Sequence, residues 1–148
     1  MNRIALATEP LLADHPQVVL MHRAGDAVRE ITLAIVHGAA EIANQLDAKL
    51  VVVVTHSGRT AIARAKQRDF TPTVAVSSDA QTLRQLCLLW GVTPMAEAPA
   101  EDGVALTRHI DDWGKRQGIL SPGDRVIHVS GTGLLGITHD QVIVHEVG

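Results

Sequence analysis

The arrangement of this chain follows from one segment, LVVVVTHSGRT (residues 50–60). Its apolar half, Leu50–Val54, is an uninterrupted run rich in β-branched side chains, which is typical of a strand buried on both faces of a parallel sheet. Its polar half, Thr55–Thr60, contains a glycine and reads as a loop, and Ala61–Arg68 then reads as a helix. The segment therefore predicts a strand, a loop and a helix of an α/β fold.

Other segments extend this pattern in both directions along the chain. Asp26 is a plausible N-cap of a helix that runs to residue 46, and Asp79 is a plausible N-cap of a second helix. The other predicted elements are a helix over 101–117, ended by Gly118, and strands over 73–76, 92–95, 125–130 and 141–147. Because no helix separates the last two strands, we expect them to be antiparallel. The prediction is a three-layer α/β/α sandwich with a mixed five-stranded sheet.

Composition indicates one folded domain and excludes several classes of function. The chain has 148 residues, of which 46% are hydrophobic, and a formal net charge of -3. Such a chain is long enough to bury a core. Its net negative charge gives no overall positive potential that would attract nucleic acid or an anionic membrane. We expect residues 1–20 to form an N-terminal helical appendage and residues 21–148 to form the domain.

Cysteine content and the absence of long apolar runs favour a location in the cytoplasm. Cys87 is the only cysteine, so an intramolecular disulfide is impossible, which fits a reducing environment. No stretch resembles a signal peptide or a membrane span. We therefore expect a cytoplasmic protein that binds neither nucleic acid nor membrane.

Two loops carry residues suited to an anionic ligand. The first, Thr55–Thr60, offers hydroxyls, a glycine, Arg59 and the start of a helix, which together favour phosphate. The alternative is that Ser57 or Thr55 only caps that helix while Arg59 is solvated. The second loop, after residue 130, is rich in glycine, but no helix follows it, so it is no dinucleotide-binding fingerprint.

Other reactive side chains favour structural interpretations. The paired candidates His128 with His145, and His56 with His139, have no carboxylate or cysteine at metal-ligand spacing, so we expect no metal and no cofactor. Cys87 lies on an apolar helical stripe and is expected to be a buried core thiol. Adjacent carboxyls at 111 and 112 are expected to lie on a solvated helix face.

Several segments resemble the C-terminal α/β domain of pyruvate kinase. Thr55–Ala61 is similar to a Thr-x-Ser-Gly-Arg-Thr-Ala segment that follows a strand in that family. Asp69–Val76 is similar to its Arg-Pro-x-x-Pro-Ile-x-Ala-Val stretch, and Thr82–Pro94 to its Arg-x-Leu-x-Leu-x-Trp-Gly-Val-x-Pro signature. Further matches near the chain end are Pro122-Gly123-Asp124, Ser130-Gly131 and Thr138-His139. Together these matches span roughly residues 27–147 in one order.

The resemblance implies a sheet of order 3-2-1-4-5 with strand 5 antiparallel, in which the two loops face each other. In regulated members of the family this place binds a sugar bisphosphate, commonly fructose 1,6-bisphosphate. The second loop here has Leu134 and Leu135 in place of the basic or aromatic residues of some relatives. The effector-binding residues expected from position are Thr55, His56, Ser57, Gly58, Arg59, Thr60, Gly131, Thr132, Gly133 and Gly136.

The catalytic (β/α)8 barrel of pyruvate kinase needs about 250 residues. This sequence has 148 residues, so we expect the barrel to be missing from it. We therefore expect a stand-alone module that binds a phosphorylated metabolite and has no catalytic activity of its own. The alternatives are an oligomerisation domain or a separately encoded part of a pyruvate kinase, which converts phosphoenolpyruvate and ADP to pyruvate and ATP. A broad apolar face on the helix over 26–46 favours a homodimer or larger homo-oligomer.

Overall fold

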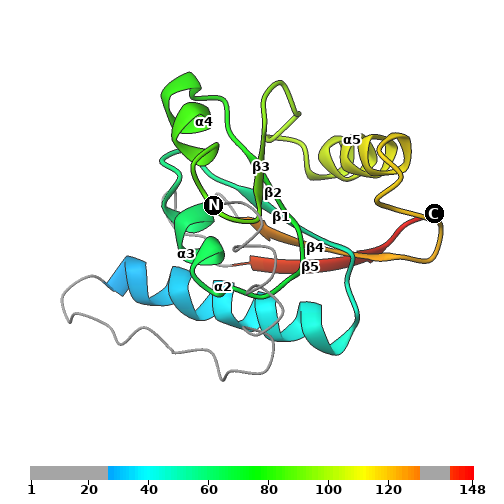
Figure 1. Ribbon diagram of the computed structural model, residues 1–148, viewed down its shortest axis with the longest axis horizontal. Coiled ribbons are helices and arrows are strands. Elements are labelled where there is room, and N and C mark those ends of the chain that lie inside the picture. The colour runs from blue at the N-terminus through cyan, green and yellow to red at the C-terminus, as the bar shows by residue number, and fades with distance from the viewer. Residues whose placement is uncertain (1–26, 131–140) are drawn as a thin grey trace, which may run out of the picture.

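The computed structural model describes residues 27–130 and 141–148. In chain order, the described elements are α2 (Ala27–Gln45), β1 (Leu50–Val54), α3 (Arg59–Ala65), β2 (Thr73–Val76), α4 (Ala80–Leu86), β3 (Val92–Met95), α5 (Gly103–Arg116), β4 (Arg125–Ser130) and β5 (Gln141–Glu146). Figure 1 shows α5 on one side of the sheet and α2 with α3 on the other.

The five strands form one sheet in the order β3-β2-β1-β4-β5. β1 pairs in parallel with β2 and β4, and β2 pairs in parallel with β3. β5 pairs with β4 in the antiparallel direction, with Ser130 opposite Gln141. The predicted architecture, strand order and antiparallel last strand are therefore confirmed.

Alternation along β1 divides the core into two layers. Val51 and Val53 face the side covered by α2 and α3, where they pack with Val36 and Ala39 of α2. Leu50 and Val52 face the other side, where the packing partners include Leu106 and Ile110 of α5. Leu50 to Val53 are fully buried because helices cover both faces of this central strand.

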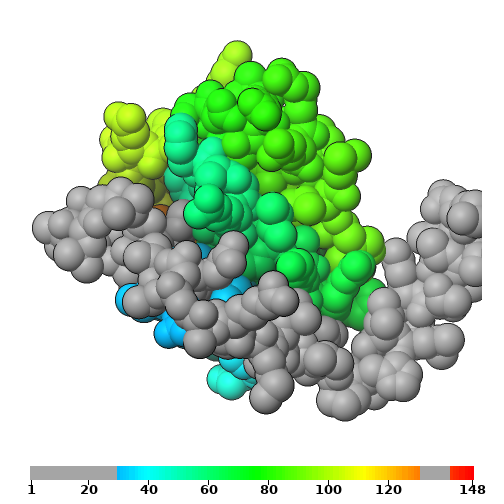
Figure 2. All heavy atoms as spheres, turned by 90° about the vertical axis from the view of Figure 1, so that its left-hand side faces the viewer, coloured from blue at the N-terminus to red at the C-terminus, as the bar shows by residue number. Residues whose placement is uncertain are grey.

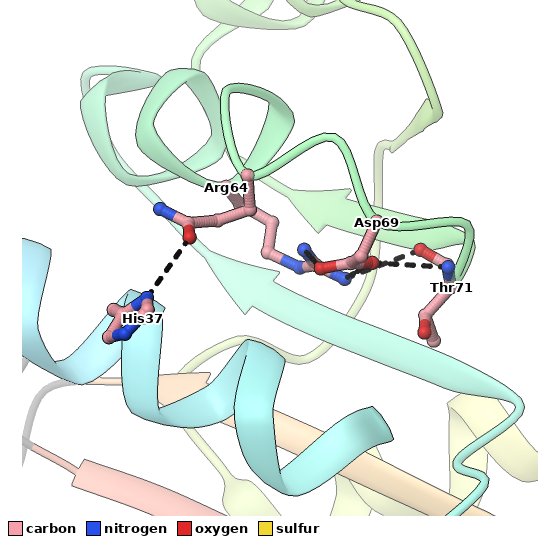
Figure 3. Close-up of polar contacts among 5 residues, drawn as sticks. His37, Arg64, Asp69 and Thr71 are labelled. Atoms are coloured by element: carbon pink, nitrogen blue, oxygen red, sulfur yellow. Dashed lines mark hydrogen bonds and ion pairs between the residues drawn. The ribbon is translucent and has the colours of Figure 1, made fainter. Parts of the chain in front are cut away.

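A buried ion pair closes the connection between α3 and β2. Figure 3 shows the Arg64 side chain extending from α3 to the carboxylate of Asp69. Arg64 Nη2 donates to Asp69 Oδ1 at 2.6 Å, and Nη1 bonds to the other carboxylate oxygen. Asp69 also accepts from the backbone N–H of Thr71 at 3.1 Å. The Arg64 side chain is 2% exposed, so the Asp69 carboxylate compensates a charge that has almost no contact with water.

α4, the helix predicted to begin after Asp79, ends earlier than the sequence pattern indicates. Its early end corrects the prediction for Cys87. α4 ends at Leu86, so the apolar stripe does not continue through Cys87 to Trp90. Cys87 is exposed rather than buried, and its Sγ lies 3.4 Å from the carbonyl oxygen of Leu83. The N-cap prediction for this helix is confirmed, because the Asp79 carboxylate accepts from the backbone N–H of Thr82 at 2.6 Å.

Other element boundaries differ by a few residues. α3 begins at Arg59 and ends at Ala65, and α5 begins at Gly103 after the N-cap Asp102. Gly118 has φ +69, as its predicted place after a helix requires. The proposed appendage over 1–20 and the N-cap Asp26 lie outside the described residues. Within the described part of the chain, no helix combines the length and apolar character needed to cross a membrane.

Candidate functional site

The loop between β1 and α3 has a buried frame and an exposed surface. Thr55 and Thr60 are 3% and 2% exposed, and Gly58 is also buried. His56, Ser57 and Arg59 are exposed. The buried residues therefore shape the loop, and the exposed ones are available to a ligand.

The hydrogen bonds of this loop do not support the capping alternative. Thr55 Oγ1 accepts from the backbone N–H of Gly58 at 3.0 Å, so this hydroxyl closes the turn before the helix. Gly58 is the N-cap, with φ +75, and no side chain caps α3. By contrast, Asp79 and Asp102 cap α4 and α5. Ser57 therefore does not cap α3, which was the alternative interpretation of this loop.

A contact with α4, which the sequence analysis did not identify, holds the loop in place. Thr82 Oγ1 donates to the carbonyl oxygen of His56 at 2.9 Å, and a Cβ on Gly58 would lie 3.4 Å from the Thr82 methyl group. In Figure 2 the loop and α3 lie against α4. Hydrogen bonds from Thr82 hold the pKa of Asp79 below its ordinary value, and His56 and Arg84 lower it further. The loop is therefore braced by the helix that follows β2.

The second predicted loop lies outside the described residues. Gly131, Thr132, Gly133 and Gly136 lie outside the described residues, as do Leu134, Leu135 and His139. The two residues on either side of it, Ser130 and Gln141, are described and pair with each other across β4 and β5.

A cleft of about 790 Å³ lies between α5 and the part of the sheet formed by β4 and β5. Its volume is in the range of small-molecule sites. The lining includes Val54 at the carboxyl end of β1, Ser130 at the end of β4, Gln141 at the start of β5 and the N-terminal turn of α5. The loop over 55–60 does not line this cleft. The loop follows the carboxyl end of β1, and the cleft lies beside the carboxyl ends of β1 and β4, which are neighbours in the sheet.

Two histidines and a carboxylate meet beside the cleft. The sequence analysis paired His128 with His145 but missed Asp111. Asp111 Oδ1 lies 2.8 Å from His145 Nε2, so Asp111 is not the solvated carboxylate that we expected. The ring centroids of His128 and His145 are 5.0 Å apart. Asp111 is next to Ile110 on the border of the inward face of α5, and this position was the only signal in the sequence. Asp112 is exposed, as expected.

Burial sets the charge of His128. Loss of contact with water lowers the pKa of His128 to about 4; His145 lowers it further, and Asp111 opposes the shift. Its Nε2 is buried without a hydrogen-bond partner, as is Nδ1 of His145. His128 is therefore a neutral imidazole at neutral pH. No group of three or more His, Cys, Asp or Glu residues within the described ranges is arranged to hold a metal ion.

Comparison with known proteins identifies the family of this fold. The family model described as "Pyruvate kinase, alpha/beta domain" matches residues 33–145. The chain belongs to this family. The pyruvate kinase of Sporosarcina psychrophila is 36% identical over 152 residues and that of Geobacillus stearothermophilus is 33% identical over 131 residues. The matches to these two relatives cover 100% and 88% of this chain.

The pyruvate kinase α/β domain accounts for only part of each relative. The chain spans 25% of the Sporosarcina protein and 22% of the Geobacillus protein. A crystal structure of a pyruvate kinase from Cryptosporidium parvum superposes with a TM-score of 0.73 at 21% identity, over 85% of this chain and 24% of that chain. That likeness confirms the fold. The chain therefore corresponds to the C-terminal domain of a pyruvate kinase, and the resemblance on which we identified it is confirmed.

Proposed function

We propose that this pyruvate kinase α/β domain is a regulatory module that binds a phosphorylated metabolite and has no catalytic activity of its own. The observation that carries the proposal is the exposed loop between β1 and α3. Ser57 and Arg59 are exposed there, and no side chain caps the helix start beside them. A guanidinium can donate two parallel hydrogen bonds to a phosphate, and Ser57 adds a hydroxyl donor.

Rigidity of the loop supports the proposal further. The turn is closed by Thr55, and Thr82 holds it against α4. A preorganised loop loses less conformational entropy when it binds a ligand. The proposed binding residues are those that the sequence indicates, with Ser57 and Arg59 as direct phosphate contacts and Thr55, Gly58 and Thr60 as the supporting frame.

The proposal is tested by a thermal-shift titration of the purified chain with fructose 1,6-bisphosphate, glucose 6-phosphate, ribose 5-phosphate and inorganic phosphate. A ligand that binds only the folded state at a hundred times its Kd stabilises it by about 2.7 kcal/mol. We expect Arg59→Ala to weaken binding by about 1.5–3 kcal/mol, since a charged hydrogen bond is lost.

The matched control is Arg116→Ala, which removes an exposed arginine from the last turn of α5. This variant should bind each phosphate compound with the same affinity as the unsubstituted chain. Absence of a shift with every phosphate compound, or equal affinity of the Arg59→Ala variant, would contradict the proposal.

A second candidate function is assembly into a homo-oligomer. Ile31 of α2 and Val144 of β5 remain 49% and 40% exposed. β5 is the last strand in the sheet order, so one edge of it has no strand beside it in the described chain. Most of the apolar face of α2 packs inside the domain, since Val36, Ala39 and Ala43 are buried against the sheet. The surface for assembly is therefore smaller than the sequence pattern indicates.

A further inference from the structure

The two most exposed large apolar side chains of the described chain lie in regions of opposite charge. Leu88 follows the end of α4 and is 87% exposed, and Val104 lies in the first turn of α5 and is 74% exposed. Single apolar side chains are common on protein surfaces and need no partner. The residues that accompany these two, however, have the composition of contact surfaces.

An aromatic pair and an arginine lie just before β2 and β3 begin, next to the segment that contains Leu88. The rings of Phe70 and Trp90 pack edge to face, with their centres 6.0 Å apart. The guanidinium of Arg68 lies 5.3 Å from the centre of the Trp90 ring. Phe70 remains 49% exposed in spite of this contact. Tryptophan, phenylalanine and arginine are enriched at the surfaces through which proteins bind each other.

The same region has an excess of exposed positive charge. Every exposed charged side chain within residues 61–94 is basic. The carboxylates of this range are used inside the domain, because Asp69 pairs with Arg64 and Asp79 caps α4. We call this region the basic face; it comprises Lys66, Arg68, Phe70, Arg84, Leu88 and Trp90.

The segment that contains Val104 has the opposite charge. Glu97, Glu101 and Asp102 are exposed, and residues 95–107 contain no basic side chain. Arg108 follows on α5, but the carboxylates still outnumber it. We call this region the acidic end; it comprises Glu97, Glu101, Asp102 and Val104.

The basic face and the acidic end lie at opposite ends of β3 and on opposite sides of the sheet. Phe70 and Trp90 precede β2 and β3, whereas the segment over 97–104 follows β3. Leu86 of α4 packs in the layer that contains α2 and α3, and α5 covers the other side of the sheet (Figure 1). The sheet therefore separates the two regions within one molecule, and only another molecule can bring them together.

Backbone pairing at this edge of the sheet is disfavoured. β3 is the first strand in the sheet order, and its Pro94 has no backbone N–H to donate to a further strand. A contact here must therefore depend on side chains rather than on extension of the sheet.

We propose that the basic face of one copy of this chain binds the acidic end of a second copy, with Leu88 and Val104 at the centre of the contact. A second copy supplies both properties that complement the basic face, which are exposed carboxylates and a highly exposed apolar side chain. Complementary charge steers such encounters and fixes their register. Because two different surfaces meet, the contact is heterologous, and further copies can add at either end. Neither the loop over 55–60 nor β5 takes part, so the inference is independent of the proposed function.

Sedimentation velocity at about 20 mM salt and up to about 1 mM chain tests the proposal, with Val144→Lys in every sample to oppose pairing through β5. We expect the mean mass to rise with concentration beyond that of a dimer. About 0.5 M salt should weaken the association constant roughly tenfold, because it screens exposed charges. A monomer at every concentration at low salt would overturn the proposal.

Two variants at the exposed apolar positions give a sharper test. Leu88→Glu places a carboxylate opposite the acidic end, and Val104→Lys places an ammonium group opposite the basic face, so each variant alone should stay monomeric. An equal mixture of the two should form dimers and nothing larger. The reason is that the Val104→Lys copy keeps an intact basic face and the Leu88→Glu copy keeps an intact acidic end. Formation of this dimer also shows that both variants are folded.

Ile119 provides the matched control, since it is 39% exposed and lies after α5, outside both regions. Ile119→Glu and Ile119→Lys should each associate like the parent chain. Monomers in the mixture of Leu88→Glu with Val104→Lys, or association that either variant leaves unchanged, would overturn the proposal.

Discussion

At the scale of single residues, the fold treats two buried ionisable side chains, Arg64 and His128, differently. Arg64 keeps its charge, because Asp69 lies against it and accepts two hydrogen bonds. His128 is 6% exposed, and its buried Nε2 has no partner. A buried imidazole without a partner is disfavoured as the charged form. His128 therefore makes the stability of the domain depend on pH.

We expect the free energy of unfolding to fall as the pH is lowered from about 6.5 to about 4. In the folded state the pKa of His128 is about 4, against 6.5 as its ordinary value. In that pH window the unfolded chain takes up a proton that the folded chain does not, so stability is lost as pH falls. The full effect of this residue is about 3 kcal/mol. Urea unfolding at a series of pH values measures it.

The variant His128→Gln separates this residue from the other titrating groups. It should flatten the pH dependence within the window, whereas His37→Gln, at an exposed position on α2, should not. A slope that persists in His128→Gln would show that other groups cause the loss of stability.

At the scale of elements, two helix glycines differ in what surrounds them. Gly38 lies within α2, and a Cβ there would meet nothing within 4 Å. Gly114 lies within α5, and a Cβ there would come within 2.6 Å of Leu120 Cγ. The backbone N–H groups of Ile119 and Leu120 both donate to the carbonyl oxygen of Gly114. The segment after α5 therefore folds back onto the helix at Gly114, where there is no side chain to block its approach.

This contrast predicts opposite effects of the same substitution. Gly38→Ala should stabilise the domain by about 0.5–1 kcal/mol, because alanine favours the helix. Gly114→Ala should destabilise it by about 1–3 kcal/mol, because Leu120 must move out of its packed position. Urea denaturation of the two variants beside the unsubstituted chain measures both changes. A stabilising effect at both positions would contradict the close approach of Leu120.

At the scale of the whole molecule, the proposed assembly predicts a concentration-dependent dimer. Sedimentation velocity over a range of protein concentrations should show it. A lysine on an edge strand opposes pairing of sheet edges, so Val144→Lys should shift the equilibrium to monomer. Ile62→Lys is the control, because Ile62 is 38% exposed but lies on α3. A monomer at all concentrations, or equal effects of the two lysines, would count against assembly through β5.

Much of the fold is predictable because it depends on short-range patterns. The run Leu50–Val54 can be stable only as a strand covered on both faces, and the structure buries Leu50 to Val53 completely. Asp79 marks a helix start because its carboxylate satisfies a backbone donor three residues later. The sequence has no helical pattern between the last two predicted strands, which predicts their antiparallel pairing, and the structure confirms it. The resemblance to pyruvate kinase supplied the strand order.

Other properties could be decided only by the tertiary structure, because they join residues that are far apart in the chain. Helix periodicity placed Cys87 on an apolar stripe, but the helix ends at Leu86, and the thiol is exposed. Asp111 meets His145 only because α5 packs across the sheet at one position, which the pattern of either segment does not specify. The cleft arises in the same way, since its lining comes from the ends of β1, β4 and β5 and from one side of α5. Local sequence thus determined the elements and the candidate phosphate loop, whereas long-range packing determined the cleft beside α5 and the contacts that line it.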